Sequence, residues 1–248
     1  MGNSSHPSIE QERRKPRIPH IFWDRFFLAC GPVGIIFFCL FLPCTKSLPL
    51  ISPSLTGEDL TYRYKAHDTA WKATIPFMEL SAILWPMYAI GVNKQLARIP
   101  GISPSILSTQ VASANCIGMA FMTVAVYFAV TTFRLDRDPE LTQILSDTAW
   151  LYLTIIAPVF IVQDISISLG IRSDTRTKTL IPKWVSWVNT ISPFLYFGVL
   201  GSHCVHGGAV GWAGALTWWL TAGSFFVCFL IDLAFFWIAA GIRDEDLE

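Results

Sequence analysis

Charged residues are scarce in this sequence. Only 15% of its 248 residues are Asp, Glu, Lys or Arg, whereas a soluble domain carries about 25%. The 18 basic and 18 acidic residues cancel to a net charge of zero. Nucleic-acid binding requires a field of one sign, so we expect no nucleic-acid partner.

Motifs that hold phosphate, metal or an activated nucleophile are also lacking. The chain has no Gly-rich phosphate loop, nucleophile elbow or H-E-x-x-H motif. Its six cysteines form no C-x-x-C pair, and His203 and His206 have no further ligands at matching spacing. An acidic D-D-x-x-D cluster, which would bind a diphosphate through magnesium, is missing as well. We therefore expect no metal and no other cofactor.

Long apolar runs dominate what is present. Apolar residues make up 52% of the chain, and a membrane-spanning helix needs about 20 of them in sequence. Six stretches qualify: 26–42, 75–92, 111–133, 150–171, 184–200 and 212–241. The sequence predicts an all-α fold, a polytopic membrane helix bundle of about six transmembrane helices over residues 26–242. Polar tails at 1–25 and 243–248 flank this bundle.

The distribution of Lys and Arg predicts the orientation. With the N-terminus in the cytosol, the inner segments hold 12 of these residues and the outer loops hold 6. Positive charge is enriched on the cytosolic side of membrane proteins. We therefore expect both termini to be cytosolic.

Several local patterns predict where helices begin or bend. Asp138-Pro139-Glu140 reads as an N-cap followed by a first-turn proline and acid, so the fourth span should begin near Pro139. A similar start at Thr56-Gly57-Glu58-Asp59 predicts an amphipathic helix over 58–72 on the outer surface. Prolines inside the spans predict kinks: Pro32, Pro86, Pro158 and Pro193.

Acidic residues in or near the apolar spans are the candidate catalytic groups: Glu79, Asp147, Asp164 and Asp232. A charged residue at mid-bilayer costs about 2.5–3.5 kcal/mol on insertion scales. Such an acid must face the bundle interior, find a partner or keep its proton. A carboxylic acid that stays neutral in apolar surroundings can act as a general acid.

Helix geometry divides these acids into two pairs. Asp147 and Asp164 are seventeen residues apart on one predicted helix, or about 25 Å along its axis, so they cannot share one small site. Asp147 and Glu79 lie near the outer face, whereas Asp164 and Asp232 lie nearer the cytosol. Purely structural roles remain open for both pairs. Asp147 would then pair with Arg134 or Arg137, and Asp164 would form a hydrogen bond between helices.

Aromatic residues are the second prominent feature, with ten Trp, 18 Phe and six Tyr. Tryptophans at span ends fit an interfacial belt, whereas rings deeper in the spans are expected to line a cavity. Aromatic faces stabilise cations by about 0.5–2 kcal/mol. The candidate substrate-binding residues are Trp85, Tyr88, Tyr127, Trp150, Trp218, Arg134 and Arg137.

Five short motifs carry a resemblance to a known family: Phe133-Arg134-Leu135-Asp136-Arg137, Ser146-Asp147-Thr148-Ala149-Trp150, Phe160-Ile161-Val162-Gln163, Pro182-Lys183-Trp184 and Gly211-Trp212-Ala213-Gly214. Through them, residues 50–241 resemble small membrane proteins of actinobacteria and fungi. The fungal members are similar to integral membrane terpene cyclases of ascochlorin- and ascofuranone-type meroterpenoid pathways. Leu135 stands where the family pattern has proline, and both arginines of that motif are in place.

The resemblance implies a terpene cyclase that protonates and closes the epoxidised farnesyl chain of a prenylated phenol. Its partners would be this lipophilic substrate and the bilayer of the fungal endoplasmic reticulum. We favour the outer acids as proton donors, because Asp147 lies in a family-like motif. Two other classes remain open. A proton-coupled transporter predicts a polar path that joins both acid pairs, and a non-catalytic membrane protein predicts acids that affect only stability.

Overall fold

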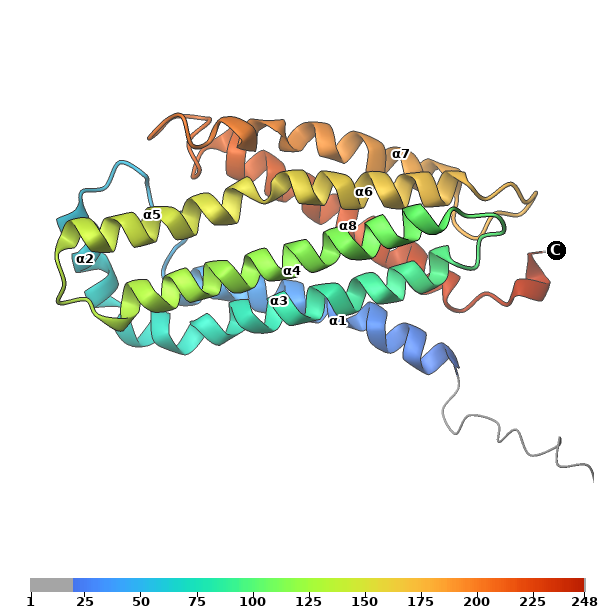
Figure 1. The fold of residues 1–248 in the computed structure, drawn as a ribbon, viewed down its shortest axis with the longest axis horizontal. Coiled ribbons are helices and arrows are strands. Elements are labelled where there is room, and N and C mark those ends of the chain that lie inside the picture. The colour runs from blue at the N-terminus through green and yellow to red at the C-terminus, as the bar shows by residue number, and fades with distance from the viewer. Residues whose placement is uncertain (1–19, 248) are drawn as a thin grey trace, which may run out of the picture.

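The computed structural model describes residues 20–247, and every regular element in that range is helical. Five helices are long and apolar enough to cross a membrane. The chain is therefore an integral multi-pass membrane protein, which confirms the predicted all-α bundle (Figure 1). The elements are α1 (His20–Cys44), α2 (Gly57–Ala66), α3 (Asp68–Leu96), α4 (Pro104–Phe133), α5 (Pro139–Ile155), α6 (Ala157–Arg172), α7 (Lys183–Ile191), the 3-10 helix η2 (Ser192–Gly201), the π-helix η3 (Ala215–Trp219), α8 (Leu220–Ala239) and the 3-10 helix η4 (Asp244–Asp246).

The predicted span 184–200 is not one of the five long helices. It consists of α7 followed by η2, whose first turn contains Pro193. Proline has no backbone N–H to continue the α-helical hydrogen bonds, so a change of helix type at this position is expected. Figure 1 shows α7 running back along α6, so the chain returns to the opposite end of the bundle before α8 begins.

The predicted helix starts at Thr56 and Pro139 are confirmed. The Thr56 side chain accepts a hydrogen bond from the Asp59 backbone N–H, and α2 follows it. The Asp138 carboxylate accepts from the Glu140 backbone N–H at 2.9 Å, and Pro139 is the first residue of α5. Each side chain satisfies a backbone donor that the first helical turn leaves unpaired.

The predicted surface helix over 58–72 is wrong in extent. The helix α2 ends at Ala66, and residues 68–72 belong to α3. Tyr64 is fully buried, and its hydroxyl hydrogen-bonds the Ser146 hydroxyl of α5 at 2.8 Å. The helix α2 is therefore packed against α5 at the end of the bundle where α1 finishes, which we call the outer end.

Prolines within the spans have two different effects. Pro158 follows the break between α5 and α6, and Pro193 lies in the first turn of η2. Pro32 and Pro86 lie inside α1 and α3, which continue past them. Proline thus interrupts two of the four helical stretches in which we predicted kinks.

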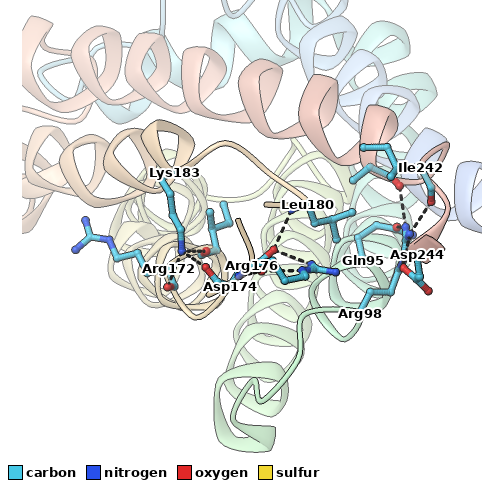
Figure 2. Close-up of polar contacts among 11 residues, drawn as sticks. Gln95, Arg98, Arg172, Asp174, Arg176, Leu180, Lys183, Ile242 and Asp244 are labelled. Atoms are coloured by element: carbon cyan, nitrogen blue, oxygen red, sulfur yellow. Dashed lines mark hydrogen bonds and ion pairs between the residues drawn. The ribbon is translucent and has the colours of Figure 1, made fainter. Parts of the chain in front are cut away.

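The last described elements, α8 and η4, are joined to the end of α3 at the inner end of the bundle. The Arg98 guanidinium donates to the Gln95 side chain at 2.8 Å, to the carbonyls of Ala239 and Ile242, and to the Asp244 carboxylate (Figure 2). Arg98 thereby fixes the end of α8 and the following η4 to the end of α3. Part of the predicted tail 243–248 is therefore folded against the bundle.

The start of α1 is fixed at the same end. Gln95 donates to the Asp24 carboxylate at 3.2 Å, and Lys94 forms an ion pair with it. Residues 20–25, which we predicted to belong to the N-terminal tail, are part of α1. The described chain therefore starts and finishes at one end of the bundle, as two cytosolic termini require. Residues 1–19 of the predicted tail lie outside the described residues.

The loop between α6 and α7 is fixed by a second polar network (Figure 2). The Asp174 carboxylate accepts from the Arg176 guanidinium and from the Leu180 backbone N–H. Burial acts to raise the pKa of Asp174, but these hydrogen bonds outweigh it and lower the pKa to about 2. The Lys183 ammonium donates to the carbonyls of Arg172 and Asp174. Lys183 therefore satisfies one carbonyl at the end of α6 and one in the loop that follows it.

Candidate functional site

An apolar cavity of about 290 Å³ lies between the outer halves of α1 and α8. The junction of α5 with α6, the helix α4 and the segments η2 and η3 complete its wall. This volume is just below the usual range for small-molecule sites, about 300–1,000 Å³. The cavity is lined mainly by aliphatic and aromatic side chains, so it suits a lipophilic ligand.

Three irregular helical segments converge on this cavity. Ile156 lines it from the junction of α5 and α6, Tyr196 from η2, and Trp218 from η3. Backbone departures from α-helical geometry cost stability, and π-helical turns are frequent at functional sites. Gly198 allows η2 and η3 to approach closely, because a Cβ there would lie 2.8 Å from the Leu216 carbonyl oxygen. The shape of the cavity therefore depends on these interruptions.

A layer of aromatic rings forms the inner floor of the apolar cavity. The ring centroids of Phe160 and Phe225 are 5.1 Å apart, and Trp85 lies within 6 Å of both rings. Phe225 lines the apolar cavity and also a second, smaller cavity on the inner side. The aromatic layer therefore separates an apolar cavity from a polar one.

Two aspartates line the smaller cavity, which has a volume of about 20 Å³. That is room for about one water molecule. Asp164 comes from α6 and Asp232 from α8, and both are more than nine-tenths buried. Asn189 of α7 donates to Asp232 at 2.7 Å. Among residues 20–247, no ion pair includes either aspartate.

Tyr196 connects the apolar cavity with this acid pair. Tyr196 lines the apolar cavity, and its hydroxyl donates to the Asp164 carboxylate at 3.1 Å. The same hydroxyl lies 3.2 Å from the Ser192 hydroxyl, and Ser192 in turn donates to the Ser224 carbonyl of α8. These contacts hold Tyr196 between the apolar cavity and a buried carboxyl group.

The structure brings five of the predicted site residues to these two cavities. Asp164, Asp232, Trp85 and Tyr88 line the small cavity, where the Trp85 indole donates to Gln163 at 3.2 Å. Trp218 lines the apolar cavity. The inner pair of acids predicted from helix depth is thus assembled at one site.

The outer acids are not part of this site. Glu79 on α3 and Asp147 on α5 are half-buried, and neither lines the two cavities. Asp147 also lacks the predicted ion pair with Arg134 or Arg137. Arg137 instead donates to the carbonyls of Val130 and Arg134, where α4 ends.

The remaining predicted substrate-binding residues also lie elsewhere. Trp150 is fully buried and packs edge-on against Phe128 at 5.2 Å. Tyr127 pairs with Tyr152 across α4 and α5, at 6.4 Å. Arg134 and Arg137 line a separate depression at the outer end of α4.

Sequence reasoning missed Tyr196, Asn189, Phe160 and Phe225 as parts of the site. Asn189 and Tyr196 both fall in the predicted span 184–200, where hydrogen-bonding groups stand among apolar residues. That contrast was an available signal for both residues. Phe160 and Phe225 carry no comparable signal, because phenylalanine is common throughout the apolar stretches.

In the described range 20–247, no three His, Cys, Asp or Glu residues gather where they could hold a metal ion. No protein-family model, curated protein or solved structure matches the chain. Function must therefore be inferred from the two cavities and from the residues between them.

Proposed function

We propose that this protein is a membrane-bound terpene cyclase acting on the epoxidised farnesyl chain of a prenylated phenol. One observation carries the proposal. Tyr196 lines an apolar, aromatic cavity and is hydrogen-bonded at 3.1 Å to the buried Asp164. A lipophilic substrate in that cavity would have an acidic hydrogen-bond network at one point on its wall. The substrate itself comes from the resemblance of the sequence motifs.

The inner acids are suited to supplying a proton. Two carboxyl groups line one small cavity, and no cationic side chain in the described range forms an ion pair with them. Like charges oppose each other, and burial penalises a bare carboxylate, so the pair retains a proton. Asp164, hydrogen-bonded to Tyr196, is the proposed donor, and Asp232 is the second member of the pair.

The proposed reaction is an isomerisation. In the reactive arrangement, the Tyr196 O–H turns from Asp164 to the epoxide oxygen and gives its proton to it. Protonated Asp164 returns a proton to the phenol oxygen, and the adjacent carbon–oxygen bond of the epoxide breaks. The alkenes of the folded chain attack the electron-poor carbon in turn and form the new carbon–carbon bonds. Loss of a proton from the final carbocation to the carboxylate restores the acid pair, so atoms and charge balance. The rings of Trp218, Phe160 and Phe225 would stabilise the cation at about 0.5–2 kcal/mol each.

The proposal includes the location and partners of the protein. The substrate dissolves in the bilayer, and the host membrane is the endoplasmic reticulum of a fungal cell. A cavity that holds the farnesyl chain of the substrate in one folded conformation would supply much of the rate enhancement, because the reacting carbons are already positioned.

The direct test is conversion of an epoxyfarnesyl phenol by microsomes that contain the protein, with products analysed by mass spectrometry and NMR. Asp164→Asn should lower the rate by about 10²–10⁴-fold, because a general acid contributes that much. Asp147→Asn is the matched control, since this acid lies in the same bundle but outside both cavities. We expect it to retain near-normal activity.

The opposite result would assign the proton donor to the outer acids. If Asp147→Asn abolishes turnover and folded Asp164→Asn does not, the assignment of the donor to the inner pair is wrong. If folded wild-type protein leaves the substrate unchanged, the cyclase proposal itself fails.

A proton-coupled transporter is the second candidate, since two buried acids in a bundle also suit a proton relay. A relay that used both acid pairs would need polar groups between the inner and outer acids. The apolar cavity and its aromatic floor favour a cyclase instead. Solute uptake into vesicles that is driven by a proton gradient and is lost in the Asp164→Asn variant would support the transporter.

A further inference from the structure

The ends of the bundle offer a ligand little access to the apolar cavity. At the outer end, the Trp212 indole donates to the Ile51 carbonyl at 2.8 Å, and Gln143 donates to the Leu55 carbonyl. These bonds hold the loops before α2 and before η3 across that end. On the inner side, the layer of aromatic rings that includes Phe160 and Phe225 closes the cavity. Access is therefore expected from the side.

An opening on the side of the bundle lies between the helices α1 and α8. Near the inner end they are joined, where the Arg25 guanidinium lies 5.3 Å from the Trp237 ring centroid. Toward the outer end, both helices line the cavity instead, and α1 packs mainly against α3. Cys39 of α1, Leu48 of the following loop and Trp219 of η3 line the cavity and are also exposed.

This opening faces lipid. Cys39 and Trp219 lie within helical stretches that are long and apolar enough to span a membrane. The neighbouring surface of α1 includes the exposed apolar side chains Ile36 and Leu40. A lipophilic ligand dissolved in the bilayer would reach the opening along a protein surface that is as apolar as the ligand. A ligand that came from water would have to cross the hydrogen-bonded outer loops.

We propose that the gap between the outer halves of α1 and α8 is a lateral portal. Through it, a lipophile with a single apolar chain passes from the bilayer into the cavity. The inference deepens the proposed function, on which it rests for the identity of the cavity as a substrate site. Binding through the portal does not depend on the chemistry that follows.

The position of Cys39 makes the portal testable. A larger side chain there would project into the gap that both helices line, so Cys39→Trp should obstruct it. Cys116 provides the matched control, because it is exposed on α4 and does not line the cavity. The two variants place the same bulky ring on two lipid-facing helices.

The assay is photolabelling of the full-length protein in phosphatidylcholine vesicles with a diazirine-bearing long-chain alcohol. Labelled residues are then located by tandem mass spectrometry. In wild-type protein we expect adducts on Tyr196 and Thr217, which line the cavity and are buried from the lipid-facing surface. Cys39→Trp should lower this labelling by about tenfold, because close-packed walls do not admit an extra ring without displacement. Cys116→Trp should label like wild type.

Equal labelling of Tyr196 and Thr217 in wild type and Cys39→Trp would overturn the portal, as would the absence of adducts on both residues in wild type. If thermal unfolding shows that Cys39→Trp is not folded, Cys39→Phe takes its place under the same criteria. Labelling needs no turnover, so the two proposals can fail separately. Normal labelling without cyclisation would overturn only the proposed function. Cyclisation with unaltered labelling in the Cys39 variant would overturn only the portal.

Discussion

Tyr196 is the residue at which a lipophilic cavity and a buried acid meet. Its ring contributes to the apolar wall, and its hydroxyl is bonded to Asp164 and Ser192. A phenol in this position can pass a proton between a carboxyl group and a ligand without exposing a charged carboxylate to the cavity. We therefore expect Tyr196 to affect the chemical step more than substrate binding.

Tyr196→Phe removes the hydroxyl and keeps the ring. Steady-state kinetics should show kcat lowered by about 10²–10⁴-fold with KM nearly unchanged, since proton transfer is lost and the cavity wall is kept. Tyr152→Phe is the control, because Tyr152 does not line either cavity. A rise in KM with unchanged kcat would assign Tyr196 to binding instead of proton transfer.

Individual site residues were only partly predictable. Helix depth alone placed Asp164 and Asp232 together, because a residue's depth follows from its distance to the span ends. Choosing between the two acid pairs required knowing which side chains face a common cavity. That depends on helix rotation and packing, which a hydropathy pattern does not fix. The preference for Asp147 came from its motif, and Asp147 lies outside the two cavities.

The helical elements were predicted well where the signal is local. Capping at Thr56 and Asp138 follows from side-chain chemistry within a few residues, and the breaks near Pro158 and Pro193 follow from the missing N–H of proline. The π-helical turn over 215–219 has no such marker in the sequence. It depends on tertiary contact with η2, where Gly198 lets the two segments approach.

Gly198→Ala tests whether this close approach shapes the cavity. The added Cβ would lie 2.8 Å from the Leu216 carbonyl oxygen, so η2 and η3 must separate. We expect a clear loss of cyclisation with a smaller change in thermal stability. Gly223→Ala is the matched control on α8, because its Cβ would meet open space. That variant should keep full activity and gain up to about 1 kcal/mol of helix stability. Equal activity in the two variants would contradict a role for the η2–η3 contact.

The whole molecule is a bundle fixed at both ends and open at one side. Arg98 and Asp24 join the ends of α1, α3 and α8, and Asp174 orders the loop between α6 and α7. At the outer end, α2 and the long loops are hydrogen-bonded to α5 and to each other. The irregular segments lie between these fixed ends, around the apolar cavity. A rigid scaffold with a lipid-facing opening is the architecture expected of an enzyme whose substrate is dissolved in the bilayer.

The most direct measurement is turnover by the purified protein in lipid nanodiscs, with an epoxyfarnesyl phenol as the single substrate and a chelator present. The account predicts a cyclised product of unchanged mass, formed without added metal or cofactor and lost in Asp164→Asn. Unchanged substrate from folded wild-type protein, or equal product from folded Asp164→Asn, would contradict it.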